Sequence, residues 1–367
     1  MVGCISVLPK CEKGGSGIMK GIGLVFAGGG GKGSYEIGVW KYLHEIGLDQ
    51  YVRAVSGTSV GALNAALFAG SSYELAEELW LNISQEKILT PKEVSAEDIM
   101  KWLVANGVAL SLPMLRGVSK VVSGTVLGVE KIAQIMFAKL MGDHMFSREG
   151  IVEMISDGLD FNRLRSSELP CFVTCVRCPG LIIKRFRLNA YSDDDITKVL
   201  LASSAIPIIF PNEEFQGEKY CDGGIPIVGD NVPVEPVYNT GVEHIIVVHL
   251  SQDALVDKEQ FPNSNIIEIV PHEDLGNALS GTLDFSSEGA LMRLQLGYED
   301  AKRIMQPMVD MIIMKAANQN MLKVAQQTNI EYEKERQGLI KEENSIKEKM
   351  ARDGFDALFE NLTKENK

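Results

Sequence analysis

The sequence is poor in cysteine, histidine and tryptophan, with six, five and three of them among 367 residues. So few cysteines cannot form a dense disulfide framework and are typical of reduced thiols in the cytosol. Cys171, Cys175 and Cys178 have the spacing of some iron–sulfur ligands. The segment that holds them has the composition of a strand, however, whereas a cluster needs a loop that can wrap around it. We therefore favour buried core thiols and predict no metal and no cofactor.

Basic residues and long apolar runs are also scarce. The chain has 36 Lys and Arg against 49 Asp and Glu, which gives a net charge of −13. No basic run with interleaved aromatic residues is present, so nucleic-acid binding is not expected. The longest weakly charged region, residues 102–115, contains Gly107 and Pro113 and is shorter than the roughly 20 residues that span a bilayer. Residues 1–10 lack the pattern of a signal peptide, so we expect a cytoplasmic protein without a transmembrane helix.

The chain length suggests one large domain with an appendage. Residues 1–19 form a glycine-containing lead-in, and residues 20–306 are expected to form the main domain. A mostly helical insertion is predicted at about 71–165. Residues 307–367 become densely charged, with apolar residues at helix-like intervals, which predicts a C-terminal helical extension.

Strand and helix patterns alternate at the start of the main domain. Residues 22–27 are an apolar run, and apolar residues follow at helical spacing over 35–46; the order repeats in 52–55 and 60–69. Such alternation predicts an α/β fold with a mostly parallel central sheet and helices on both faces. The further strands that we expect lie at 172–176, 181–188, 219–221, 245–250 and 266–270, and the further helices at 193–205 and 286–305.

A serine stands at the second strand-to-helix junction. Ser59 lies between Gly57 and Gly61, in the turn that ends the strand over 52–55. A sharp strand-to-helix turn holds such a serine in a strained conformation and leaves no room for side chains two positions away. The following helix presents its positive end to the hydroxyl. The pattern therefore predicts a nucleophile.

A glycine loop stands at the first junction, in Gly28-Gly29-Gly30-Gly31-Lys32-Gly33. Its N–H groups precede a helix and can approach an anionic group closely. The best candidate donors for a developing oxyanion are the amides of Gly29, Gly30 and Gly31. The loop also fits a dinucleotide fingerprint, with Asp49 as the ribose ligand. The serine on the next strand favours the oxyanion hole.

Asp222 is the candidate proton acceptor. It follows a short strand and precedes Gly223 and Gly224, which permit a tight turn. Burial can raise the pKa of such a carboxyl group, which makes it a competent base for a hydroxyl. A structural aspartate in a β-turn is the other interpretation.

Histidine is the usual base for a serine nucleophile. Three of the histidines, His244, His249 and His272, follow both Ser59 and Asp222, in the chain order of an α/β-hydrolase triad. None of them stands in a glycine-flanked loop, so we favour a Ser–Asp pair. The other two, His44 and His144, precede Asp222 and have no expected role.

The three motifs together resemble the patatin-like phospholipases. The loop from Gly28 to Gly33 with Lys32, the Gly57–Gly61 motif and Asp222-Gly223-Gly224 match the family signature, and the resemblance extends over about 21–305. It implies a three-layer α/β domain, Ser59 as nucleophile, Asp222 as base and the glycine loop as oxyanion hole. It also implies lipid acyl hydrolysis without metal or cofactor.

The resemblance leaves several functions open. An acyltransferase or a thioesterase would use the same pair, and a nucleotide-binding protein is the alternative from another class. A lipid substrate at a membrane surface is the expected partner, together with an unspecified protein or small-molecule activator. Residues 102–141 are either core or cap helices or a lid that meets acyl chains. Some relatives are secreted effectors, so secretion also stays open beside the cytoplasm.

Overall fold

The computed structural model describes residues 21–84, 148–178, 180–206, 210–225, 228–253 and 255–364. The chain divides into two units, Met1–Met305 and Gln306–Lys367. The lid interpretation of residues 102–141 falls outside the described residues, as does His144.

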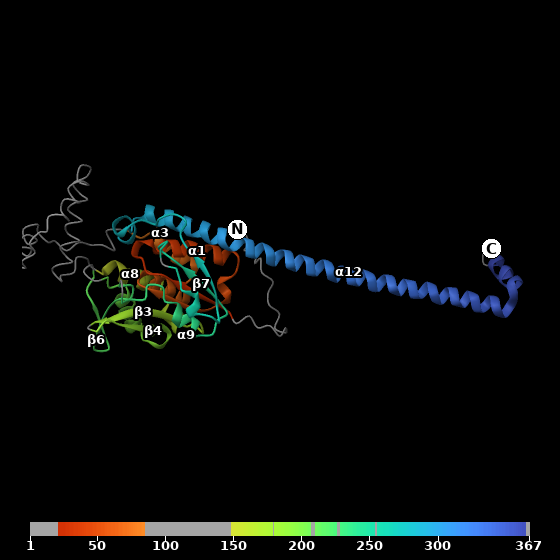
Figure 1. Cartoon of the computed structure of the whole chain (residues 1–367), viewed down its shortest axis with the longest axis horizontal. Helices are drawn as coiled ribbons and strands as arrows, with labels where there is room; N and C mark the ends of the chain where they lie inside the picture. The colour runs from red at the N-terminus through yellow and green to blue at the C-terminus, as the bar shows by residue number, and fades with distance from the viewer. Residues whose placement is uncertain are drawn as a thin grey trace, which may run out of the picture. The chain divides into compact units, whose positions relative to one another are not determined.

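A mostly parallel sheet of eight strands forms the centre of the first unit (Figure 1). The strand order is β5-β6-β3-β2-β1-β7-β8, and β4 pairs with β3. Five neighbouring strands, β3-β2-β1-β7-β8, are parallel to one another. The other three are antiparallel: β4 and β6 each pair with β3, and β5 pairs with β6. The strands are β1 Ile22–Phe26, β2 Val52–Thr58, β3 Cys171–Cys178, β4 Ile182–Arg187, β5 Glu213–Phe215, β6 Glu218–Asp222, β7 His244–Val248 and β8 Asn265–Ile269. This confirms the predicted fold class.

Helices cover both faces of the sheet because neighbouring side chains of a strand point to opposite sides. Val25 of β1 joins a buried cluster with Val234 and Val237 of α11. Phe26 instead packs against Phe68 of α2, with ring centroids 6.4 Å apart. The helices are α1 Ser34–Glu45, α2 Val60–Gly70, α3 Tyr73–Leu81, α8 Glu149–Gly158, α9 Phe161–Ser166, α10 Asp193–Ser203, α11 Val234–Tyr238 and α12 Ser287–Lys364.

Most elements lie where the sequence predicts them, with two differences in the strands. The second strand continues to Thr58, beyond the predicted end at residue 55. The short strand β5 has no counterpart among the predictions. The segment with three cysteines is a strand, as expected. Its thiols are free, and those of Cys171 and Cys175 are buried, whereas Cys178 is only partly buried.

The part of α12 in the first unit, up to Met305, buries a face that combines apolar residues with a charge and a glycine. Leu294 and Ala301 are buried, at 3% and 0% exposure, and so is Arg293 at 1%, whereas Leu291 is 56% exposed. A Cβ atom at Gly297 would lie 2.0 Å from the carbonyl oxygen of Tyr35. The buried face of α12 therefore holds Arg293 and the glycine contact with α1 together with these apolar side chains.

The second unit is helical to Lys364, and the backbone leaves helical geometry at Gly354, with φ 71° and ψ 170°. This confirms a C-terminal helical extension. Several apolar side chains along it are exposed, among them Met321 and Leu339. In the described parts of the chain, no helix is both long enough and apolar enough to cross a membrane.

Candidate active site

The register of the sheet places Ser59 and Asp222 at the same level. Thr58 is paired with Thr174 on the parallel strand β3, and the next β3 residue, Cys175, is paired with Asp222 on the antiparallel strand β6. Ser59 directly follows Thr58, so it lies level with Asp222 with one strand between them. The glycine loop follows β1, the parallel neighbour of β2, and reaches the same edge.

Ser59 occupies a strained turn between β2 and α2. Its backbone has φ 55° and ψ −125°, a combination that side-chain-bearing residues rarely adopt. A Cβ atom at Gly57 would lie 2.0 Å from the carbonyl oxygen of Gly61, and one at Gly61 would lie 2.4 Å from that of Phe26. The two glycines thus give α2 the close approach that this turn requires, as the sequence predicts.

Asp222 is buried beside Ser59. The residue is 5% exposed, and its Oδ1 accepts a hydrogen bond from the Gly224 amide at 2.6 Å. Oδ2 is buried without a hydrogen bond of good geometry among the described residues. Burial raises the pKa of Asp222 to about 6, and the neighbouring Ser59 hydroxyl and the Gly224 amide act in the opposite direction. We attribute this combination to a Ser59 hydroxyl that is close to the Asp222 carboxyl group but not well aligned with it.

The raised pKa predicts that Asp222→Asn stabilises the protein at neutral pH. The folded protein holds the Asp222 proton more tightly than the unfolded chain does. Proton binding at Asp222 therefore contributes fully to the free energy of unfolding below pH 3.8, and this contribution is lost as the pH rises through about 6. Above that pH an uncharged amide removes a cost on the order of 2–3 kcal/mol. Urea denaturation at about pH 4 and about pH 8 should show the larger gain at the higher pH. A variant that is less stable at the higher pH contradicts the prediction.

The histidine alternative finds no support in the contacts of the described residues. His249 is fully buried, and its Nε2 lies 3.0 Å from Glu268. His272 Nδ1 lies 2.6 Å from Asp300, and His244 begins β7 at the opposite edge from Ser59. No hydrogen bond within the described structure joins any of them to Ser59 or Asp222. The side chain next to Ser59 is therefore a carboxyl group.

The glycine loop is fixed at its start by Asn231, which the sequence analysis did not identify. The amide of Gly28 donates to the Asn231 carbonyl at 3.0 Å, and Asn231 Nδ2 donates to the Gly28 carbonyl at 3.1 Å. A Cβ atom at Gly224, beside Asp222, would lie 2.3 Å from Asn231 Oδ1. Asn231 therefore sits between the glycine loop and the Asp222 turn and sets their spacing.

The middle of the loop packs against residues 280–284. Gly30 has φ 59°, and a Cβ atom there would lie 2.2 Å from the Thr282 carbonyl oxygen; at Gly31 it would lie 2.1 Å from that of Asp284. The amide of Lys32 bonds back to the Gly29 carbonyl at 3.3 Å. Only glycine permits this packing, which holds the loop in one shape.

Arg293 of α12 holds the loop and the 280–284 segment together. One guanidinium nitrogen donates to the carbonyl oxygens of Gly31 at 3.2 Å and Asp284 at 3.1 Å, and the other donates to the Ser280 carbonyl at 2.8 Å and the Asp284 carboxylate at 2.6 Å. The planar guanidinium presents several donors in a fixed geometry. Sequence reasoning missed Arg293 because it falls among apolar residues on an otherwise ordinary amphipathic helix.

Ser203 connects the serine turn to the Asp222 strand. Its hydroxyl accepts a hydrogen bond from the Ser59 amide at 2.9 Å and donates to the Thr174 carbonyl at 2.7 Å. Its carbonyl accepts from the Gly223 amide at 3.4 Å. The residue is fully buried. Only the folded chain reveals this link.

The dinucleotide interpretation fails on the position of Asp49. This residue precedes β2, so it lies at the amino end of that strand, whereas the glycine loop lies at the carboxyl end of β1. A ribose ligand must stand at the same edge as the loop that holds the pyrophosphate. Asp49 instead contacts His44 Nδ1 at 2.6 Å.

A narrow apolar cavity of about 40 Å³ opens at Ser59. Gly30 and Ser59 line it, together with apolar residues of helices α2, α3, α8 and α10 that include Leu63, Trp80 and Leu200. We call this cavity the serine slot. An apolar group held there would lie beside the Ser59 hydroxyl and the glycine loop.

Among solved structures, the chain is similar to VipD from Legionella pneumophila, with 17% identity, a TM-score of 0.47, and 78% of this chain and 67% of that one aligned. It is also similar to the type III effector ExoU of Pseudomonas aeruginosa, with 19% identity, a TM-score of 0.39, and 78% and 53% aligned. It is similar as well to human GIVD cytosolic phospholipase A2, with 9% identity, a TM-score of 0.37, and 81% of this chain and 59% of that one aligned. The chain thus spans about half to two thirds of these proteins.

No curated protein matches the sequence. The sequence model of the family described as Patatin-like phospholipase matches residues 24–238. That range contains the glycine loop, Ser59 and Asp222, and it is more than half of the chain. The protein therefore belongs to the patatin-like phospholipase family.

Proposed function

We propose that the protein is a serine lipid acyl hydrolase of the phospholipase A type, with residues 20–306 as its catalytic domain. Membership of the family supports a lipid hydrolase. The observation that carries the finer proposal is the buried Asp222 carboxyl group beside a serine on a strained turn. A pKa near neutrality suits a base that must accept and return a proton in each cycle.

In the first half of the proposed reaction, Ser59 Oγ attacks the ester carbonyl carbon and Asp222 takes the hydroxyl proton. The carbonyl oxygen becomes an oxyanion, which the amides of Gly29, Gly30 and Gly31 would stabilise. The amides on either side of them, those of Gly28 and Lys32, are already bonded within the protein. The C–O bond then breaks, the alcohol leaves with the proton from Asp222, and the acyl group stays on Ser59.

In the second half, a water molecule gives a proton to Asp222 and attacks the acyl carbon. The bond to Ser59 breaks, its oxygen recovers the proton, and a fatty acid leaves. An acyltransferase or a thioesterase would differ only in the acceptor or the leaving group. The proposed partner is a lipid at a membrane surface, and an activating protein or small molecule is compatible with the same chemistry.

The proposal predicts a pH dependence of hydrolysis. Only the ionised carboxylate accepts a proton, and burial raises the pKa of Asp222 to about 6. We therefore expect kcat/KM to rise about tenfold per pH unit below that value and to become constant above it. Initial rates with a soluble short-chain ester measure the profile. A profile that is already flat well below the pKa of Asp222 contradicts its role as base.

The direct test is release of fatty acid by the full chain. Purified protein and a Ser59→Ala control would be incubated with phospholipids, lysolipids and neutral glycerides, each with and without an added alcohol or lysolipid acceptor. Hydrolysis that depends on Ser59 supports the proposal. Transfer to the acceptor without free fatty acid would favour an acyltransferase, and no acyl cleavage of any ester would refute both.

A further inference from the structure

Asn64 of α2 uses its whole side-chain amide in hydrogen bonds. Its Nδ2 donates to the Gly33 carbonyl at 2.9 Å and to Glu36 Oε2 at 2.7 Å, and its Oδ1 accepts from Trp80 Nε1 at 2.9 Å. A backbone carbonyl can only accept and an indole can only donate, so the amide has a single orientation. Asn64 and Glu36 are fully buried, and Trp80 is 1% exposed. The Asn64 side chain is therefore fixed in one position inside the fold.

The partners of Asn64 belong to different parts of the proposed site. Gly33 ends the glycine loop, and Trp80 lines the serine slot. Asn64 itself stands in the second turn of α2, the helix that begins directly after Ser59. A Cβ atom at Gly33 would lie 2.4 Å from Val60 Cγ2 and 2.7 Å from the Trp80 ring. The end of the loop thus lies against the start of α2, and Asn64 bonds the two together.

Glu36 of α1 supplies a buried carboxyl group to this network. Its Oε2 accepts the bond from Asn64, and its Oε1 has no hydrogen bond of good geometry among the described residues. Burial raises the pKa of Glu36 well above its ordinary value, and the Asn64 side chain and the nearby Ala27 amide act in the opposite direction. The side chain is therefore neutral at physiological pH. Because Ala27 directly precedes the glycine loop and Gly33 ends it, Glu36 and Asn64 contact the loop at both ends.

We propose that Asn64 and Glu36 are positioning residues, which hold the oxyanion donors of the glycine loop in a fixed place relative to Ser59. This inference rests on the proposed hydrolase function and adds two residues that its mechanism does not use. Oxyanion stabilisation depends on donors that are already aligned when the charge forms, so a shift of the loop slows the chemical step. Neither residue touches the substrate in this proposal, so substrate binding should change little.

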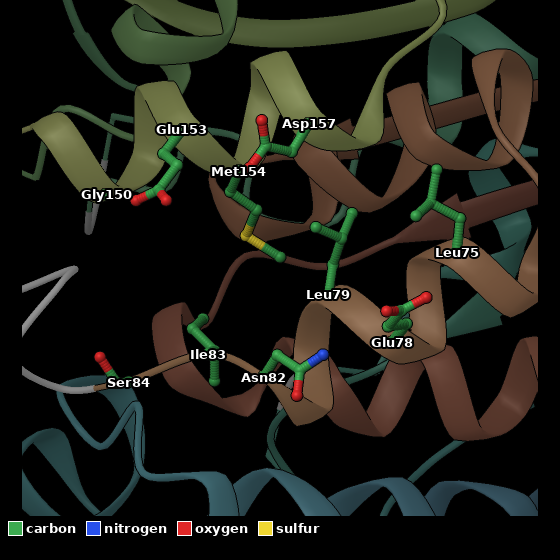
Figure 2. Close-up of a pocket in the computed structure, with 10 residues that line it drawn as sticks. All are labelled: Leu75, Glu78, Leu79, Asn82, Ile83, Ser84, Gly150, Glu153, Met154 and Asp157. Carbon is green, nitrogen blue, oxygen red and sulfur yellow. The ribbon is translucent and has the colours of Figure 1, made fainter.

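The kinetic test compares variants that remove the network with a variant that keeps it. Asn64→Leu and Glu36→Leu are each expected to lower kcat for p-nitrophenyl butyrate at least about tenfold, with KM within about twofold of the wild-type value. Glu36→Gln keeps a neutral acceptor for the Asn64 amide and should retain the wild-type kcat. Asn82→Leu and Glu78→Leu are the matched controls, because both side chains are exposed and line a cavity between α3 and α8 (Figure 2).

A purely structural role would lower the stability of the two leucine variants and leave the kcat of the folded enzyme unchanged. That result, in an enzyme whose hydrolysis depends on Ser59, overturns the positioning role and leaves the proposed function standing. A loss in Glu36→Gln as large as that in Glu36→Leu overturns it as well. Should Asn64→Leu fail to fold, Asn64→Ser takes its place, because serine adds no bulk and is too short to make the three bonds.

Hydrogen–deuterium exchange of residues 28–33 gives a readout that does not depend on catalysis. We expect these amides to exchange faster in both leucine variants than in the wild type, but not in Glu36→Gln or in the matched controls. If the wild type cleaves no ester, the hydrolase proposal fails by itself and this measurement decides. Faster exchange then supports the hold of Asn64 and Glu36 on the loop, and unchanged exchange overturns it.

Discussion

Ser59→Ala and Asp222→Asn are each expected to lower kcat/KM for ester hydrolysis by at least about a thousandfold. The first change removes the nucleophile. The second leaves a side chain of the same shape that still accepts the Gly224 hydrogen bond, made at 2.6 Å in the wild type, but that cannot take a proton. The two side chains act as a unit, so the double variant should be no slower than either single variant by more than a small factor.

The control for this experiment is His244→Gln, because His244 lies at the amino end of β7, whereas Ser59 follows the carboxyl end of β2. We expect it to retain wild-type kcat/KM. Thermal unfolding of all variants shows whether lost activity reflects lost structure, and Asp222→Asn is expected to be at least as stable as the wild type at neutral pH. Substantial hydrolysis by either Ser59→Ala or Asp222→Asn would refute the proposed mechanism.

The parts of the site that follow a strand could be predicted from the sequence because their signals are local. The turn at Ser59 needs small residues at Gly57 and Gly61, where a Cβ atom would meet backbone oxygens at 2.0 and 2.4 Å. Such a requirement produces a motif of neighbouring residues, which can be recognised in the sequence alone. The position of Asp222 beside Ser59 could only be hypothesised, because it depends on the antiparallel pairing of β6 with β3.

The residues that support the site could not be predicted, because each acts on segments remote in the sequence. Asn231 bonds to Gly28, and Ser203 bonds to Ser59. Neither the residue types of Asn231 and Ser203 nor their positions in the sequence indicate these contacts. Arg293 was hidden for another reason: periodicity assigns apolar residues to the core, whereas here a paired charge and Gly297 occupy the buried face of α12.

Arg293→Met is expected to destabilise the protein by about 3–5 kcal/mol, which is typical of breaking a buried ion pair. The side chain of Arg293 is 2% exposed and that of Asp284 is 25% exposed, at a distance of 2.6 Å. Methionine supplies similar bulk but no donor, so the Asp284 carboxylate and three carbonyl oxygens lose their partner. Urea denaturation at neutral pH measures the change. The same substitution at Arg336, which is 58% exposed in its ion pair with the 46% exposed Glu333, should cost less than about 1 kcal/mol.

Arg293→Lys separates a catalytic effect from the loss of stability. A lysine can bond to one or two of the four acceptors but cannot hold Gly31 and the 280–284 segment at once. The oxyanion donors would then be less well positioned, so kcat for a short-chain ester should fall at least about tenfold while KM changes little. Arg293 contacts no substrate in this proposal and acts through the shape of the glycine loop. Equal losses in Arg293→Lys and in an Arg336→Lys control, or a change in KM alone, would contradict that positioning role.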